Sequence, residues 1–135
     1  MRASYAERIK DRIREGFGHY NNGYEDWLEW CNTLYEPDAH YNYYGRRFTL
    51  QEYKDNVGWL FSAFDVKLGG LDNMIVEGDW VAIRYSLEFT KKETGEKFVA
   101  NNMEFVLFKD HPEPIGARCV EGWAITDNPL TDHLD

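Results

Sequence analysis

The spacing of the apolar residues changes once along this chain, and this change constrains the fold more than any other feature. In the first half, Ile9, Ile13 and Phe17 recur at helical spacing between charged residues, and a run from Leu50 to Phe64 has the same period. From residue 81 to residue 89, apolar and polar side chains alternate, as they do in a half-buried strand. The sequence therefore predicts an α+β domain, with helices packed on one face of a curved sheet.

Three helices are predicted before residue 65. The first spans residues 4 to 20 and stops at Asn21-Asn22-Gly23, and the second is short, with Trp27 to Tyr35 marking its apolar side before Pro37. Residues 49–52 (TLQE) form a capping box that begins the third helix, which extends to about Phe64. Between the second and third helices, the tyrosine-rich residues 38–44 are predicted to be extended and to end at Gly45.

An antiparallel meander is predicted for the rest of the chain. Residues 66–77 supply a strand before a tight turn at residues 77–79, and residues 91–97 (KKETGEK) form a hairpin turn with Gly95 at its tip. The strand that contains Glu104, a proline-marked turn (KDHPEPIG) and a strand from about Ala117 to Thr126 follow. We expect one domain over residues 1–135, with residues 128–135 as a flexible tail.

Composition limits the classes of partner and the location. Asp and Glu number 24 against 15 Lys and Arg, and the net charge of −9 argues against a nucleic-acid groove or an anionic membrane surface. Cys31 and Cys119 show no spacing that supports a disulfide, and the amphipathic N-terminus is not a signal peptide. We therefore expect two reduced thiols and a cytoplasmic protein. Aromatic residues form 16% of the chain, so some of them should line a cavity or an interface.

The stretch NNMEFVLF, residues 101–108, places a carboxyl group in an apolar strand. Alternation assigns Met103, Phe105 and Leu107 to one face, and Asn102, Glu104, Val106 and Phe108 to the other. An ionised carboxylate between apolar faces is unfavourable unless it is paired, protonated or functional. Glu104 is therefore the leading candidate for a functional group, and the alternative is a structural pair with Asn102, Arg84 or Arg118.

The face opposite Glu104 carries its own apolar residues. These are Met103, Phe105 and Leu107, together with Trp123 and Ile125 of the last strand. Because helices cover only one side of the sheet, this face predicts a homodimer interface, and the alternative is that long loops cover it.

Four segments resemble the SnoaL-like proteins of the nuclear transport factor 2-like superfamily. They are YEPDA (residues 35–39), LFSAF (60–64), IVEGDWVAIRY (75–85) and VEGW (120–123). The resemblance implies a cone-shaped α+β fold with a pocket between the helices and the concave sheet, in a homodimer formed through the convex face. Members include polyketide cyclases, ketosteroid isomerase, scytalone dehydratase, epoxide hydrolases and non-catalytic binders, so the fold does not imply one reaction.

The resemblance also assigns positions to individual residues. Glu104 falls where ketosteroid isomerases carry an acid that donates to the substrate oxyanion, and where SnoaL-type cyclases carry a histidine. The isomerase base corresponds to Tyr43 and its oxyanion tyrosine to Gly16, while the cyclase aspartate corresponds to Ala124. Neither known set of catalytic residues is complete, so the resemblance implies a site particular to this chain.

The candidate site follows from these positions. We expect Glu104 to be the acid, base or donor, with Tyr43 and Asn102 as further catalytic residues. The expected substrate-binding residues are Tyr20, Tyr41, Ile83, Tyr85, Val106, Gly122 and Ala124. The two tyrosines of the extended segment fill the core equally well in the alternative interpretation, and Gly122 is also consistent with a bulge. His19 and His40 are alternative acid/base groups, although solvent or interface positions are favoured for both.

No other mechanism has the residues that it needs. The sequence contains no His-x-x-x-His or Cys/His cluster with metal-ligand spacing, no Gly-x-Ser-x-Gly elbow and no glycine-rich phosphate loop. We expect a lyase or isomerase without metal or cofactor, which moves protons on a hydrophobic cyclic or aromatic oxygenated substrate. The rival hypothesis is a non-catalytic ligand-binding or protein-interaction domain with the same cone.

Overall fold

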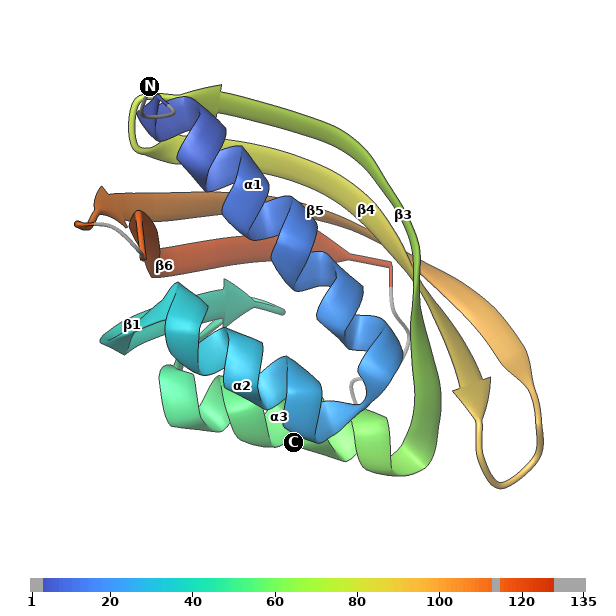
Figure 1. Ribbon diagram of the computed structural model, residues 1–135. Coiled ribbons are helices and arrows are strands. Elements are labelled where there is room, and N and C mark those ends of the chain that lie inside the picture. Colours follow the sequence, from blue (N-terminus) through green and yellow to red (C-terminus); the bar gives the residue numbers. More distant parts are fainter. Residues whose placement is uncertain (1–3, 113–114, 128–135) are drawn as a thin grey trace.

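A computed structural model describes residues 4–112 and 115–127 of the chain. The helical elements are α1 (Tyr5–Phe17), the 3₁₀ helix η1 (Gly18–Asn22), α2 (Tyr24–Leu34) and α3 (Leu50–Ala63). The strands are β1 (Tyr35–Tyr43), β2 (Arg46–Thr49), β3 (Phe64–Glu77), β4 (Trp80–Lys91), β5 (Lys97–Asp110) and β6 (Ala117–Thr126). The predicted α+β class, with three helices packed on a curved sheet, is confirmed (Figure 1). The predicted tail, residues 128–135, lies outside the described residues.

The six strands form one sheet in the order β2-β1-β6-β5-β4-β3. Every neighbouring pair is antiparallel except β1 and β6, which run parallel. The meander predicted for residues 66–126 is antiparallel throughout, and β1, which the prediction left outside the meander, joins it in parallel beside β6. A tight turn forces its two strands to be antiparallel, but no turn joins β1 to β6, so their direction follows from how the whole chain returns to the centre of the sheet.

Strand β2 is a second difference from the sequence prediction. The chain reverses at Tyr44 and Gly45, whose φ angles are 52° and 72°, and Arg46–Thr49 pairs back along β1. Two consecutive positive φ angles match the tight hairpin turn whose twist suits a pair of strands. The extended segment thus continues into a hairpin, where the sequence predicted that it would end.

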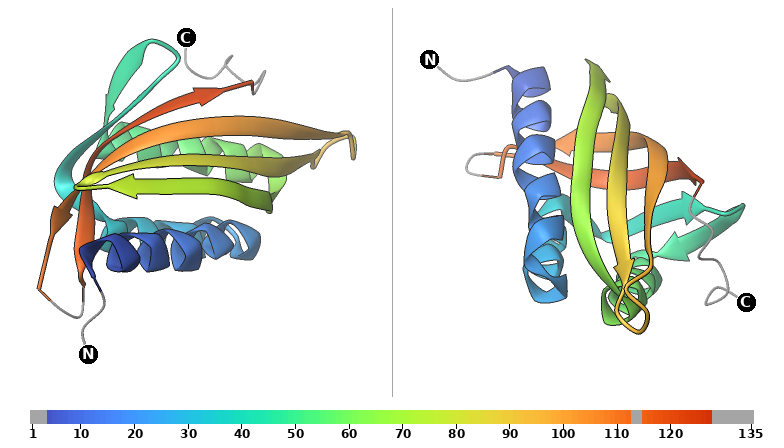
Figure 2. Two further views of the ribbon diagram at one scale, coloured as in Figure 1. Left: turned by 90° about the horizontal axis from the view of Figure 1, so that it is seen from above. Right: turned by 90° about the vertical axis from the view of Figure 1, so that its right-hand side faces the viewer.

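The sheet bends around the helices, which lie on its concave side (Figure 1). The pairing of β3 with β4 shifts between Leu68 and Gly70 and again between Leu71 and Asn73, and such bulges bend a strand and increase its twist. A Cβ atom at Gly69 would lie 2.6 Å from Oγ of Ser86, so glycine allows close contact at the bend. Figure 2 shows that, among the described residues, no helix covers the outer side of β3, β4 and β5.

Side-chain caps begin two of the helices, Ser4 that of α1 and Thr49 that of α3, while α2 has none. Thr49 and Glu52 form the expected reciprocal capping box at the start of α3. The first helix changes to a 3₁₀ helix after Phe17, and Gly23, with φ of 94°, lets the chain turn into α2. Tyr35, predicted on the second helix, is the first residue of β1.

Close contact between α1 and α2 depends on Gly16. A Cβ atom at this position would lie 1.9 Å from the indole ring of Trp30. The residue matched to the oxyanion tyrosine of ketosteroid isomerase therefore packs helix against helix. No helix of the described residues is long and apolar enough to span a membrane. Cys31 and Cys119 are both buried and unpaired.

Candidate functional site

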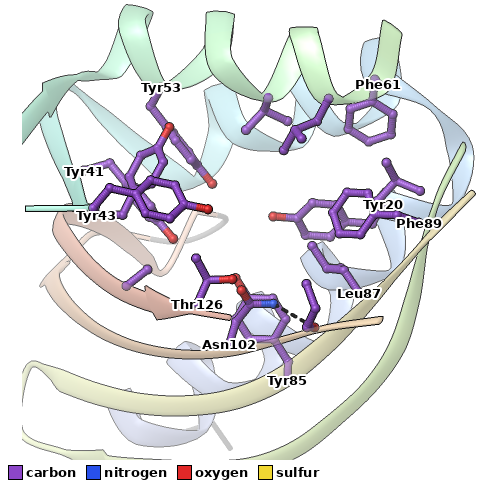
Figure 3. A pocket seen from close by; sticks show the side chains of 16 residues that line it. Tyr20, Tyr41, Tyr43, Tyr53, Phe61, Tyr85, Leu87, Phe89, Asn102 and Thr126 are labelled. Carbon is purple, nitrogen blue, oxygen red and sulfur yellow. Dashed lines mark hydrogen bonds between the residues drawn. The ribbon is translucent and has the colours of Figure 1, made fainter. Parts of the chain in front are cut away.

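A cavity of about 80 Å³ lies between the helices and the concave side of the sheet. Aromatic rings from η1, β1, α3 and β4 form most of its wall, and Tyr20 and Tyr43 extend toward the space from opposite sides (Figure 3). Its polar lining on the sheet side consists of Asn102 and Thr126. The predicted pocket residues Tyr41, Tyr85 and Ala124 also line it. The site is therefore an aromatic chamber with a few polar groups.

Glu104 is buried, with 7% of its surface exposed, and it is bonded to two tyrosines. The Tyr85 hydroxyl donates a hydrogen bond to its Oε1 atom at 2.6 Å, and the Tyr41 hydroxyl donates to the same oxygen. These contacts join β1, β4 and β5 beneath the cavity. None of the three predicted partners bonds to Glu104. Asn102 donates to the carbonyl oxygen of Ala100, and Arg84 donates to Asn73. Arg118 donates to the carbonyl oxygens of Tyr35 and Asn32.

The surroundings of Glu104 disfavour its charge. Burial raises the pKa of the Glu104 carboxyl above its ordinary value, and the hydrogen bonds from Tyr41 and Tyr85 lower it in part. Tyr41 and Tyr85 are also kept from ionising, because burial and the nearby Glu104 hold the pKa of both hydroxyls well above the ordinary range. Tyr41 and Tyr85 are therefore neutral donors, and Glu104 is the group of this cluster that can change its protonation state.

Glu104 lies behind the wall of the main cavity and is not among the described residues that line it. Instead it lines a second cavity of about 20 Å³ next to α1, together with Ile83 and Val106, which were predicted to bind substrate. Tyr20 and Tyr53 line both cavities and stand between them. Substrate in the main cavity would therefore meet Tyr41 and Tyr85, which line it, before it met the carboxyl group.

Tyr41 is held in place from two sides. Its ring stacks on Tyr53 of α3, with 4.0 Å between centroids and 14° between planes. On its other side, a Cβ atom at Gly122 would lie 3.0 Å from the Tyr41 ring. Gly122 was predicted to line the pocket, and it does not, because the ring of Tyr41 covers it. Its role in the structure is to leave room for that ring.

Of the remaining predicted residues, Tyr43 lies at the main cavity and the two histidines do not. Tyr43 lines the main cavity, and its hydroxyl accepts a hydrogen bond of 2.7 Å from Asn56 of α3. His19 lies 2.5 Å from Asp26 and stacks on Trp30, and neither His19 nor His40 is among the described residues that line the cavities. The histidines are therefore not placed to act on a ligand in the main cavity.

Three residues at the site were not predicted from the sequence: Tyr53, Asn56 and Tyr44. Tyr53 fell on the apolar side of the predicted third helix, so the helical spacing could have identified it as a cavity residue. The contacts of Asn56 and Tyr44 depend on how α3 meets the β1–β2 hairpin, and no local pattern indicates that arrangement.

A larger groove of about 1040 Å³ lies on the outer side of the sheet, beside the β1–β2 hairpin. The exposed apolar residues that line it are Ile75, Met103, Phe105, Trp123 and Ile125. Tyr43, Tyr44, Ala124 and Thr126 line both this groove and the inner cavity. The cavity therefore meets the groove where the hairpin tip approaches the end of β6.

Within the described residues, no group of three or more His, Cys, Asp and Glu side chains is arranged to hold a metal ion. The chemistry of the cavity therefore has to be derived from Glu104, the tyrosines and the two polar groups on the sheet side.

No family model matches the sequence, and no curated protein is significantly similar to it. Solved structures are similar to it over most of their length. A protein from Jannaschia sp. CCS1, provisionally classed as a SnoaL-like polyketide cyclase, is 14% identical, with 94% of this chain and 90% of that chain covered and a TM-score of 0.76. AclR from Streptomyces galilaeus, provisionally classed as a hydroxylase, is 23% identical over 97% of both chains, with a TM-score of 0.77.

A third similar structure is a nuclear transport factor 2-like protein from Anabaena variabilis. It is 12% identical, with 95% of this chain and 96% of that chain covered and a TM-score of 0.68. At such low identities a structural likeness establishes the fold, while the reaction has to be argued from the site. The chain therefore has the fold of the SnoaL-like proteins in the nuclear transport factor 2-like superfamily, as its sequence motifs indicate.

Proposed function

We propose that this protein is a cofactor-independent lyase or isomerase that transfers protons on a hydrophobic, cyclic or aromatic, oxygenated substrate. The observation that carries the proposal is the position of Glu104. It is a buried carboxyl group, bonded to the hydroxyls of Tyr41 and Tyr85, next to an aromatic cavity that both tyrosines line.

Proton transfer requires a group that is stable in both protonation states near the working pH. Burial raises the pKa of Glu104 above its ordinary value, and a carboxyl group with a raised pKa can act as a base in one step and as an acid in the next. Tyr41 and Tyr85 would orient the substrate oxygen, while Tyr20, Tyr43 and Asn102 would contact the rest of the ring. An aromatic wall with few polar groups suits a flat, mostly apolar molecule.

The names of similar structures support this class of reaction. One similar protein is provisionally classed as a SnoaL-like polyketide cyclase. A substrate larger than the cavity would extend past Tyr43 and Tyr44 into the outer groove, since the two spaces share these residues.

A specific observation also favours the rival function, a non-catalytic binding domain. The cavity volume of about 80 Å³ is well below the range of roughly 300–1,000 Å³ that is typical of ligand pockets. A binder would use the same residues to hold a small oxygenated ligand without moving its protons.

Exchange of carbon-bound protons separates the two functions. Single-ring ketones, including cyclohexanone and cyclohex-3-enone, would be incubated in D₂O with the protein, and deuterium incorporation and isomerisation would be followed by NMR. The enzyme hypothesis predicts faster exchange with the wild type, and a loss of about 10²- to 10⁴-fold in Glu104→Gln. Glu88→Gln is the matched control, because Glu88 is an exposed carboxyl on the neighbouring strand β4.

The exchange experiment contradicts catalysis in two ways. The enzyme hypothesis is wrong if the wild type accelerates exchange in none of the ketones. It is also wrong if Glu104→Gln and Glu88→Gln exchange as fast as the wild type. Binding of the same ketones without exchange would support the rival function.

The outer face supports a further part of the proposal, a homodimer. Met103 is 60% exposed, Phe105 is 59% exposed and Trp123 is 37% exposed, in a contiguous apolar groove without a helix over it among the described residues. Soluble monomers rarely expose a contiguous apolar patch of this kind, and a self-complementary face that pairs two copies would bury it. We also propose a cytoplasmic location, in which Cys31 and Cys119 stay reduced.

A further inference from the structure

The hydrogen bonds of Tyr41 and Tyr85 leave the cavity with an unusual polarity. A tyrosine hydroxyl has one proton to donate and lone pairs to accept with. Both hydroxyls donate their proton to Oε1 of Glu104. While Glu104 is ionised, the two tyrosine oxygens can therefore offer only lone pairs to a ligand, and they favour a ligand oxygen that donates, such as that of a phenol or an enol.

Protonation of Glu104 has to change this arrangement. A proton on Oε1 would donate to one tyrosine oxygen, and that tyrosine would then turn its own proton toward the cavity. A proton on Oε2 would leave both tyrosines unchanged, but Oε2 makes no hydrogen bond with any described residue. A proton on Oε1 has a tyrosine oxygen within hydrogen-bond distance as its acceptor, so the position on Oε1 is preferred.

We infer that Tyr41, Glu104 and Tyr85 form a proton-coupled switch that sets which ligand oxygen the cavity binds. With Glu104 ionised, the site binds a hydroxyl that donates. With Glu104 protonated, a tyrosine donates to a carbonyl or enolate oxygen. The switch rests on the proposed function, because it takes this cavity as the substrate site. It adds the ligand class, which is compounds that interconvert between a carbonyl and an enol form.

The groups around Glu104 leave it as the switching group. The titratable groups coupled to it are Tyr20, Tyr35, Tyr41, Tyr53, Tyr85 and Cys119. Burial raises the pKa of each of them above its ordinary value, so all of them are neutral at the pH where a carboxyl group titrates. The neighbours from α1 and α2 that share the small cavity with it are apolar: Ile13, Phe17, Trp30 and Leu34.

The pH dependence of binding of two matched probes tests the switch. Cyclohexanone accepts a hydrogen bond and phenol donates one, and their rings have the same size. Dissociation constants would be measured by NMR titration of the full chain across the titration of Glu104. Binding of cyclohexanone should weaken by about tenfold per pH unit above the pKa of Glu104, because one proton is taken up with the ligand. Phenol should show the opposite trend and reach its tightest binding when Glu104 is ionised.

Two variants sharpen the experiment. The amide of Glu104→Gln donates through its nitrogen and accepts through its oxygen, so it mimics the protonated carboxyl group. This variant should bind cyclohexanone at every pH as the wild type does at low pH. Tyr85→Phe should keep the pH dependence through Tyr41, while its affinity for cyclohexanone falls by roughly tenfold. Circular dichroism would show that both variants are folded.

Several outcomes would overturn the switch. Cyclohexanone affinity that is independent of pH while Glu104 titrates would place the proton on Oε2 and contradict it. The same trend for both probes, or no binding of either at millimolar concentration, would also contradict it. Binding is measured without turnover, so the two proposals can fail separately. Binding that depends on pH, without deuterium exchange, would support the switch and contradict the enzyme hypothesis. Deuterium exchange with binding that does not depend on pH would support the enzyme hypothesis and contradict the switch.

Discussion

Both sides of strand β5 carry large apolar side chains, but the two sides have very different surroundings. Asn102, Glu104 and Val106 face the helices and are buried, while Met103 and Phe105, between them in sequence, are 60% and 59% exposed. The more apolar side, that of Met103 and Phe105, is the exposed one, and the side with the amide and the carboxyl group is buried. The difference arises because the helices can cover only one side of the sheet, so the inner side becomes a chamber and the outer side is left available for another molecule.

The comparison also explains why the carboxyl group lies where it does. On the outer side a glutamate would be solvated and would have no special chemistry. On the inner side Glu104 loses water, and the sheet brings Tyr41 and Tyr85 to it from strands that are far apart in sequence. Burial and two neutral donors together give one carboxyl group an unusual proton equilibrium.

A pair of phenylalanines provides the largest expected contrast between the two sides. Phe89 is 1% exposed on the inner side and stacks on Phe98, with 5.1 Å between ring centroids. Phe89→Ala should lower the free energy of unfolding by about 3–5 kcal/mol, because it removes buried area and leaves a cavity. The control is Phe105→Ala, which should change the free energy of unfolding by less than about 0.5 kcal/mol. Unfolding by urea would be measured at a protein concentration low enough to keep the chain monomeric. Equal losses in the two variants would mean that the outer face is also part of the folded core.

The outer face has its own prediction, which concerns association. Phe105→Glu places a charge in the middle of the apolar groove and should weaken the proposed homodimer by about 2 kcal/mol or more, while the protein stays folded. Sedimentation equilibrium would measure the change. The matched control is Val99→Glu, because Val99 is exposed on the same strand but lies outside the groove. A wild type that sediments as a monomer at high concentration would refute the dimer, and an equal effect of both substitutions would refute this location for it.

The smallest expected effect is the pH dependence of stability. Burial raises the pKa of Glu104 in the folded protein above the value in the unfolded chain, so the folded protein binds more protons in the window between the two values. The contribution of Glu104 to the free energy of unfolding should therefore be greatest below the ordinary glutamate pKa and should fall as the pH rises through this window. Glu104→Gln lacks the titrating group, so the difference between wild type and variant isolates the effect. A difference that stays constant with pH, or that changes in the opposite direction, would contradict the burial of an ionisable Glu104.

Features encoded by local spacing were predictable from the sequence. The alternation from residue 81 to residue 89 and the capping box at Thr49 predicted β4 and the start of α3, because each pattern depends on residues close together in the chain. The alternation along NNMEFVLF likewise separated the face of Glu104 from that of Phe105. The fold class followed from these elements.

Features that depend on distant parts of the chain were not predictable. Strand β2 is short and begins with two exposed arginines, and the parallel pairing of β1 with β6 has no local signal. The bond from Tyr41 to Glu104 joins residues 63 positions apart, and Gly122 was assigned to the pocket because nothing in its own strand shows that Tyr41 covers it. Residue type indicated that Glu104 was unusual, but only the packing of three strands shows which groups set its protonation state.

The most direct test concerns the pKa of the Glu104 side chain. Carbon-13 NMR would follow the titration of this carboxyl group in the wild type and in Tyr85→Phe, and Glu104→Gln would assign its signal. The wild type should have a Glu104 pKa above the ordinary glutamate value, because burial outweighs the two hydrogen bonds. Tyr85→Phe should raise this pKa further, because the variant loses a hydrogen bond that stabilises the ionised form. A wild-type pKa at or below the ordinary value, or a decrease in Tyr85→Phe, would contradict the claim that burial and these two tyrosines set the protonation state of the candidate catalytic group.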